Sequence, residues 1–273
     1  MRRVIFDQDH DDYRQAIRES LERIAAPHRA AWEEAGIGPR PLFTDLGELG
    51  VFGSGVPEEH GGSGVTDFRF NMILMEEAHR LGVASAVLGP ALQADVCLPY
   101  LLSGSPEQRA RWLPGVVTGE TITAVAMTEP GTGSDLSGIA TRAVRDGDHL
   151  VVDGSKTYIT NGINADLVIV AVRTGPHPHR GLSLVVVERG TPGFERGRKL
   201  DKVGLHAQDT AELFFAGARV PAANLLGAPG SGFAQLSANL AQERLSVAVG
   251  AGAGAAPPPD WTLEHVRSRG GIG

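Results

Sequence analysis

A group of glycines and short polar residues follows an apolar segment near the middle of the chain. The side chains of residues 121–127 follow an alternating pattern that predicts a β-strand. A turn is predicted after it from Pro130, Gly131 and Gly133. Glycines let a ligand approach the backbone, and N–H groups and hydroxyls at a strand end suit an anionic or heteroaromatic cofactor. The hydroxyl and carboxyl groups around the turn belong to Thr128, Thr132, Ser134 and Asp135. An ordinary Gly/Pro/Ser turn has the same composition, so both interpretations stay open for the motif alone.

Histidine and cysteine give little sign of metal or disulfide chemistry. His177, His179 and His206 have no accompanying carboxylate at a ligand spacing, and a proline-rich segment predicts a solvent-exposed loop for the first two. Cys97 is the single cysteine of the chain, so an intrachain disulfide and a cysteine-based metal site are both excluded. We therefore expect no metal site.

The composition is that of a soluble globular protein. The chain has 273 residues, 42% of them hydrophobic, and a net charge of −7, which argues against binding nucleic acid or an anionic membrane. The N-terminus has no apolar core of a signal peptide, and no run reaches the length of a membrane span. A cytoplasmic location is the resulting expectation.

Apolar residues at helical spacing predict an all-α domain over residues 1–120. Tyr13, Ile17, Leu21 and Ile24 share one helical face. The nearly continuous apolar segment 84–102 predicts a helix that is buried on most sides. The helices are expected at 9–30, 41–50, 66–81 and 84–102 and from Ser105, with Thr66 and Ser105 as caps.

The sequence pattern changes near Thr121, where short segments rich in β-forming residues begin to alternate with turns. Strands this short and evenly spaced predict a β-sandwich or barrel over residues 121–228. Asp146-Gly147-Asp148 predicts a hairpin turn. The strands are expected at 121–127, 140–145, 149–152, 156–160, 167–173, 182–187 and 211–215.

A helical pattern returns over residues 229–273, which makes the fold class α+β. Ser231 is expected to cap a helix that carries Phe233, Leu236 and Leu240. The prolines at 257–259 must interrupt this helix, because each removes a donor and clashes with the preceding turn. A second helical pattern follows over 260–269. The chain is therefore expected to consist of a helical domain, a β-domain and the first part of a C-terminal helical bundle.

Five segments in order carry a resemblance to a known family. They are Pro57–Gly64 (PEEHGGSG), Met127–Asp135 (MTEPGTGSD), Gly154–Gly162 (GSKTYITNG), Val220–Gly227 (VPAANLLG) and Gln242–Leu245 (QERL). By these segments the chain resembles the acyl-CoA dehydrogenases over essentially its whole length. The resemblance favours the cofactor interpretation of the turn after Met127.

The resemblance implies a flavoenzyme. Members of the family bind FAD and oxidise the Cα–Cβ bond of an acyl-CoA thioester: a carboxylate removes a proton from Cα, and hydride leaves Cβ for flavin N5. The implied partners are acyl-CoA, electron-transfer flavoprotein, and further family members in a homo- or hetero-oligomer.

The resemblance also implies which residues contact the flavin. Thr128 is expected to donate to the polar edge of the ring, and Ser134 to lie where the flavin meets the pantetheine of the substrate. Thr160 is expected near flavin N5. It would belong to one wall of the flavin site, in which Tyr158 supplies an aromatic ring. Arg269 matches an arginine that reaches the flavin pyrophosphate of a neighbouring subunit. The implied cofactor-binding set is Val125, Met127, Thr128, Gly133, Ser134, Tyr158, Ile159, Thr160 and Arg269, with Ser134 also binding substrate.

Glu243 is the implied catalytic base. Most glutamates within helices are only solvated charges, so the residue type alone carries no weight. The family places its base at one of two sites, late in the C-terminal domain or on the first helix after the β-domain, and Glu243 matches the second. Burial beside an acyl chain would raise its pKa as an α-proton base requires. Arg244 is expected to be a buried cation that holds the helix and one end of the substrate.

Chains of the family continue for roughly another hundred residues as a helical bundle. The sequence therefore predicts a chain that lacks most of this domain and retains FAD weakly or not at all. An alternative is a non-catalytic or partner-dependent acyl-CoA-binding subunit. An oxidase that uses O₂ directly is a third option that the residues do not separate from a dehydrogenase.

Overall fold

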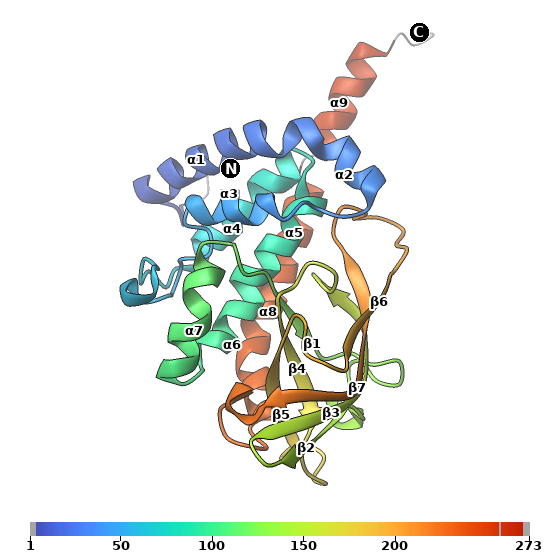
Figure 1. Cartoon of the computed structure of the whole chain (residues 1–273). Coiled ribbons are helices and arrows are strands. Elements are labelled where there is room, and N and C mark those ends of the chain that lie inside the picture. The colour runs from blue at the N-terminus through green and yellow to red at the C-terminus, as the bar shows by residue number, and fades with distance from the viewer. Residues whose placement is uncertain (1–3, 257, 270–273) are drawn as a thin grey trace.

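The first part of the chain forms a layer of helices, as the sequence predicts. The structure is a computed structural model that describes residues 4–256 and 258–269. In Figure 1 these helices lie above and beside the β-domain. They are α1 (Gln8–Ile24), α2 (Arg29–Ala35), α3 (Pro41–Glu48), α4 (Phe68–Arg80), α5 (Ala84–Leu92), α6 (Leu98–Leu102) and α7 (Pro106–Val117).

Local capping chemistry sets the helix ends, and some of these ends differ from expectation. Ser105 caps α7 in a capping box with Gln108, as predicted. Asp67, rather than Thr66, caps α4, because its carboxylate accepts from the backbone N–H of Arg69 at 3.0 Å. The expected first helix is also shorter, since α1 ends at Ile24 and a 3₁₀ turn containing Pro27 follows.

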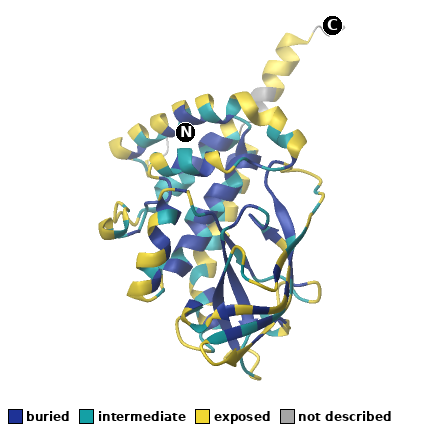
Figure 2. Ribbon diagram, in the orientation of Figure 1, coloured by how far each residue is buried: buried dark blue, intermediate teal, exposed yellow. Residues whose placement is uncertain are grey.

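The apolar segment 84–102 is one nearly continuous helical rod with a π-helical turn, Gln93–Cys97, between α5 and α6. By length and composition it could cross a membrane, so the expectation that no run reaches this length was wrong; it is the one such helix among the described residues. Within the molecule 72% of it is buried, as in the core helix of a globular protein (Figure 2).

The β-domain is one mixed sheet in the order β6-β7-β3-β2-β4-β5-β8, with β1 parallel to β4. The expected strands at 149–152 and 156–160 are a single long strand, and two strands were not predicted, β6 and β8. The strands are β1 (Thr123–Ala126), β2 (Arg142–Asp146), β3 (His149–Thr160), β4 (Leu167–Arg173), β5 (Leu182–Glu188), β6 (Phe194–Lys199), β7 (Thr210–Pro221) and β8 (Leu225–Leu226).

The sheet bends over its own core. Side chains from β4 and β5 and from β3 and β7 pack in one apolar cluster, which a flat sheet could not bring together. A second cluster joins the helices to the other face of β1, β4 and β5. The α+β class is confirmed, and the central domain is a bent mixed sheet (Figures 1 and 2).

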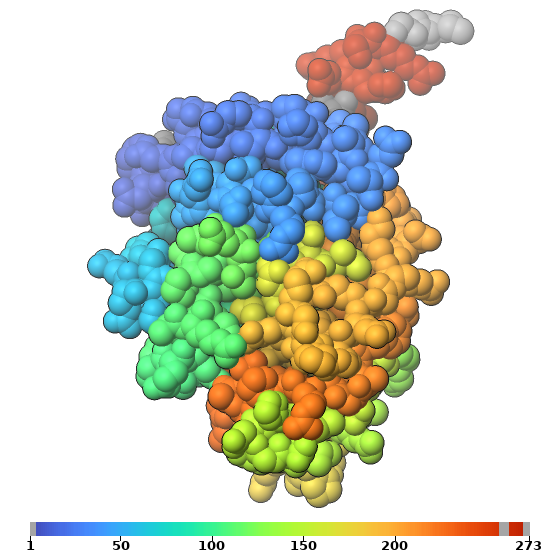
Figure 3. Space-filling view, viewed as in Figure 1, coloured from blue at the N-terminus to red at the C-terminus, as the bar shows by residue number. Residues whose placement is uncertain are grey.

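Two helices follow the β-domain. α8 (Gly232–Ala255) packs against α4 and the π turn, and α9 (Pro258–Ser268) projects away from the body of the molecule (Figure 3). The predicted break between the two helices is present, since α8 ends at Ala255, but Pro258 and Pro259 lie in the first turn of α9 and Pro257 is outside the described residues. Ser231 precedes α8 but makes no capping bond to its N–H groups; its hydroxyl donates to the carbonyl oxygen of Ala228 instead.

Candidate functional site

The end of β1 lies between the two apolar clusters. Ala124 and Ala126 are buried in the core of the β-domain, whereas Val125 and Met127 point to the opposite side and are only partly buried. Successive residues of a strand face opposite sides, so the two alanines anchor the strand while the two larger side chains line the face beside the helices.

The two predicted walls of the site meet. The backbone N–H of Thr157 donates to the carbonyl oxygen of Thr128 at 2.9 Å. The ammonium of Lys156 donates to the carbonyl oxygen of Met127 at 2.9 Å and to Oε1 of Glu129 at 2.8 Å. The segments 127–129 and 156–158, nearly thirty residues apart in sequence, are therefore fixed to one another.

Glu129 and Lys156 form a buried ion pair in which both side chains make further hydrogen bonds. The carboxylate also accepts from the backbone N–H groups of Ala140 at 2.7 Å and Thr141 at 3.0 Å. Burial alone would raise the pKa of Glu129, but the bonds from Lys156, Thr141 and Ala140 outweigh it and lower the pKa. Burial lowers the pKa of Lys156 to about 8. Both residues lie in the family-like segments, but the sequence did not predict that they form an ion pair.

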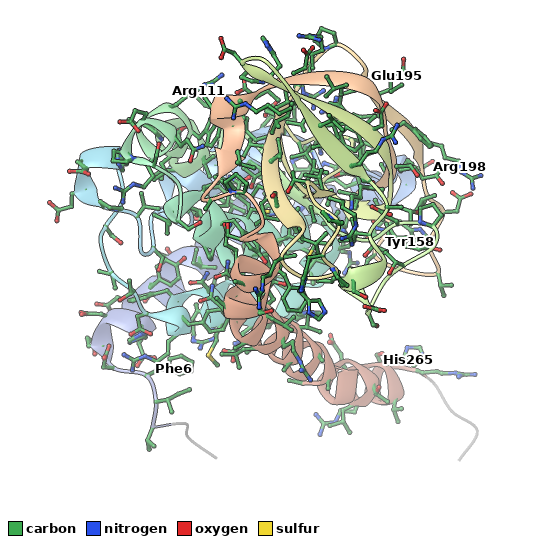
Figure 4. The ribbon with its side chains drawn as sticks, turned by 90° about the horizontal axis from the view of Figure 1, so that it is seen from below. Phe6, Arg111, Tyr158, Glu195, Arg198 and His265 are labelled. Atoms are coloured by element: carbon green, nitrogen blue, oxygen red, sulfur yellow. The ribbon has the colours of Figure 1, made fainter. Side chains whose placement is uncertain are left out.

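Tyr158 is held out of the sheet. It lies at a register shift between β3 and β7, has φ = 60° and is 69% exposed, and Figure 4 labels it on the β-domain. A non-glycine residue in the left-handed region is strained, and such residues concentrate at functional sites. The neighbouring Ile159 is buried in the β-core, so its side chain cannot contact a ligand as expected; only its backbone can.

Gln208 supports the last residue of this wall. Its amide Nε2 donates to the hydroxyl oxygen of Thr160 at 2.7 Å, and Lys202 donates to its Oε1 at 3.1 Å. Gln208 could not be predicted from the sequence, because a contact across 48 residues has no local signal.

The glycines of the turn leave room for a ligand. A Cβ added at Gly131 or Gly133 would meet nothing within 4 Å, and Ser134 is exposed beside them. An open glycine turn, an exposed aromatic ring and two half-buried threonines fit a planar heteroaromatic cofactor with an anionic tail, which is the chemistry of FAD.

Glu243 lies on α8, where its carboxylate is half-buried. The hydroxyl of Tyr100 donates to Oε1 of Glu243 at 2.5 Å. Burial raises the pKa of Glu243, and the bond from Tyr100 opposes this shift without cancelling it. A carboxyl group with a raised pKa and one neutral donor is suited to act as a general base.

Two predicted residues are not brought to these groups. Arg244 is exposed on α8 rather than buried, and Arg269 is exposed immediately after the projecting α9, where its backbone N–H donates to the carbonyl oxygen of His265 at 2.9 Å. His177 and His179 lie exposed in the loop after β4, as expected. In the part of the chain that the structure describes, no group of three His, Cys, Asp or Glu residues could hold a metal ion.

Comparison with known proteins identifies the class of this fold and site. The model of the acyl-CoA dehydrogenase N-terminal domain matches residues 7–120, and that of the acyl-CoA dehydrogenase middle domain matches residues 124–218. The chain belongs to the acyl-CoA dehydrogenase family.

Individual relatives agree with this assignment. The long-chain specific acyl-CoA dehydrogenase of Sus scrofa mitochondria is 43% identical over 90% of this chain, which spans 57% of that protein. An acyl-CoA dehydrogenase from Geobacillus kaustophilus superposes with a TM-score of 0.94 at 50% identity, over 99% of this chain and 71% of that one. A glutaryl-CoA dehydrogenase from Mycobacterium smegmatis, solved in complex with FADH2, has a TM-score of 0.88 at 29% identity, over 98% and 67%. The family binds FAD.

Proposed function

We propose that this chain takes part in the flavin-dependent α,β-dehydrogenation of an acyl-CoA thioester, with Glu243 as the base. The observation that carries the proposal is the environment of Glu243: a half-buried carboxyl group with a raised pKa and no ion-pair partner among its described contacts. The chain spans only 57% of the length of the long-chain enzyme of Sus scrofa. The activity, substrate and partners of the whole protein are therefore part of the proposal.

The residues of this chain take distinct roles in that reaction. Bound FAD supplies the acceptor for the hydride that leaves Cβ. Thr128 and Thr160 orient the cofactor through their hydroxyl and backbone groups, and Tyr158 supports its ring. Val125 and Met127 exclude water from the face beside the helices. Glu243 accepts the proton that leaves Cα.

Several finer assignments belong to the same proposal. Ser134 binds both the cofactor and the pantetheine portion of acyl-CoA. Arg269 would hold the pyrophosphate of FAD in a neighbouring subunit, which agrees with its exposed position just after α9. The proposed electron acceptor is electron-transfer flavoprotein, and the proposed location is the cytoplasm.

A second candidate function is a partner-dependent acyl-CoA-binding subunit. Exposed apolar side chains on α8 favour it, because such a surface is stabilised by association. Leu240, Leu245 and Val247 are 47%, 49% and 74% exposed. In this case the chain binds the thioester but holds flavin only beside a longer homologue.

An anaerobic visible spectrum of the chain with added FAD, before and after a panel of acyl-CoA thioesters, tests the proposal. We expect a thioester to bleach the flavin band of the wild type and of Glu264→Gln, a matched change at an exposed glutamate on α9, but not that of Glu243→Gln. Bleaching that survives in Glu243→Gln would assign the base to another residue. Thioester binding without any flavin binding would favour the second candidate.

A further inference from the structure

Side-chain hydrogen bonds fix one face of α8 against the segment 93–100. The amide of Gln242 donates to the carbonyl oxygen of Asp95 at 2.7 Å, and the hydroxyl of Ser246 donates to Oδ2 of the same residue. The bond from Tyr100 to Glu243 lies between them along α8. Because these three bonds set the rotation of α8, the carboxylate of Glu243 has a defined position.

The π turn explains why Asp95 and Tyr100 can both reach α8. In a regular α-helix, two residues five positions apart point about 140° away from one another. The π turn Gln93–Cys97 takes more residues per turn and brings both side chains toward one face. Such turns are frequent at functional sites. Without it, either Asp95 or Tyr100 would point away from α8.

The surroundings of the Tyr100 hydroxyl keep it a donor. Tyr100 is fully buried, and burial, followed by the hydrogen bond to Glu243 and the charge of that carboxylate, raises its pKa far above the usual value, although a hydrogen bond with Asn239 opposes this shift. The titratable groups that face Glu243 are Tyr100 from α6 and the buried thiol of Cys97 from the π turn, with Asp95 on the same interface. None of these groups is a cation, so the phenol is the group that orients the carboxylate.

We propose that Tyr100 is the positioning residue for Glu243: its buried hydroxyl holds Oε1 of the carboxylate and leaves Oε2 to take the proton from the substrate. The inference rests on the proposed role of Glu243 as base. Tyr100 keeps its own proton throughout and touches neither substrate nor cofactor. The bond also favours the ionised form of Glu243, so the base is active at lower pH than burial alone would allow.

A measurement that does not depend on activity tests the contact. The chain has three tyrosines, Tyr13, Tyr100 and Tyr158, so labelling the phenol carbon with ¹³C gives three resonances, and Tyr100→Phe assigns one of them. We expect the Tyr100 signal to shift as Glu243 ionises and to lose this step in Glu243→Gln, while the Tyr158 signal serves as the internal control. A Tyr100 signal that titrates identically in wild type and Glu243→Gln would overturn the proposal.

A kinetic measurement separates positioning from a merely structural role. In Tyr100→Phe we expect flavin reduction by acyl-CoA to fall about tenfold below the midpoint of its pH profile, to recover at higher pH, and to leave FAD affinity unchanged. An equal loss at every pH would contradict the proposal and assign Tyr100 to packing. If the wild type reduces no flavin while the Tyr100 signal still follows Glu243, the proposed reaction fails and the contact stands alone. If Tyr100→Phe does not fold, the wild type is compared with Glu243→Gln instead. The one tyrosine signal whose titration differs between these two proteins is then assigned to Tyr100.

Discussion

Glu129 and Glu243 are both withdrawn from solvent, but the protein surrounds their carboxylates differently. Glu129 receives a cation from Lys156 on β3 and two backbone donors from Ala140 and Thr141, just before β2, and its pKa is lowered. The interface of α8 with α6 gives Glu243 one phenol, and its pKa is raised. A carboxylate with a cation and two backbone donors is held in place in its ionised form, whereas one with a single neutral donor accepts a proton more readily. The same residue type thus serves as a support at one position, and at the other it has the surroundings that the proposed role of base requires.

The largest effect is expected from Lys156→Met, which leaves the carboxylate of Glu129 buried without its cation. We expect the free energy of unfolding to fall by about 3–5 kcal/mol, and FAD binding to weaken with it, because the two walls of the site lose their common anchor. Urea unfolding and a flavin fluorescence titration measure the two quantities.

An exposed pair on the same sheet is the matched control. Arg142 lies 3.9 Å from Asp153 with both side chains exposed, so Arg142→Met should cost at most about 1 kcal/mol. If Lys156→Met and Arg142→Met lost equal stability, the buried pair would not be what joins the two walls.

The same substitution at the two glutamates sharpens the comparison. Glu129→Gln should lower the free energy of unfolding by about 2–3 kcal/mol, because it removes the charge that pairs with Lys156 and turns amide hydrogens toward N–H donors. Glu243→Gln should change it by less than about 1 kcal/mol, since the amide oxygen still accepts from Tyr100. Parallel urea unfolding of both variants decides, and equal losses would remove the distinction between support and base.

The sequence predicted the parts of the site that are local. Ordered motifs placed Thr128 and Tyr158 on two walls, and glycines marked the open turn. The spacing could not show that Lys156 reaches Glu129, or that Gln208 reaches Thr160, because these contacts arise only when distant segments fold together. The register shift in β3 has no sequence signal either, and it is what turns Tyr158 outward and Ile159 inward.

The pattern rules also failed where elements depart from regular periods. Strands β6 and β8 were missed because one is charged and at an edge and the other is two residues long. The nearly continuous apolar segment predicted one helix over 84–102 but not its π turn, although that turn brings Asp95 and Tyr100 to α8. The prediction that Arg244 is buried was wrong, since this residue is exposed on α8.

The pH dependence of stability should have opposite signs at the two glutamates. Glu129 has a lowered pKa in the folded state, so its contribution is present above the ordinary value of 4.5 and is lost as pH falls through the folded pKa. Glu243 has a raised pKa, so its contribution is present at low pH and is lost as pH rises through the folded pKa. Subtracting the unfolding curve of each Glu→Gln variant from that of the wild type isolates each slope, and two slopes of one sign would contradict the comparison.

The smallest effect concerns the strained wall residue. Tyr158→Gly should raise the free energy of unfolding of the cofactor-free chain by up to about 1 kcal/mol, because glycine adopts φ = 60° without strain. It should also weaken FAD binding, because the aromatic surface is gone. Asn161 is the control: it has the same φ, but its amide donates to the carbonyl oxygens of Gly89 and Thr123, so Asn161→Gly should destabilise. Stability lost in both variants would show that Tyr158 contributes packing, whereas opposite signs would show that strain is kept at this position for the cofactor.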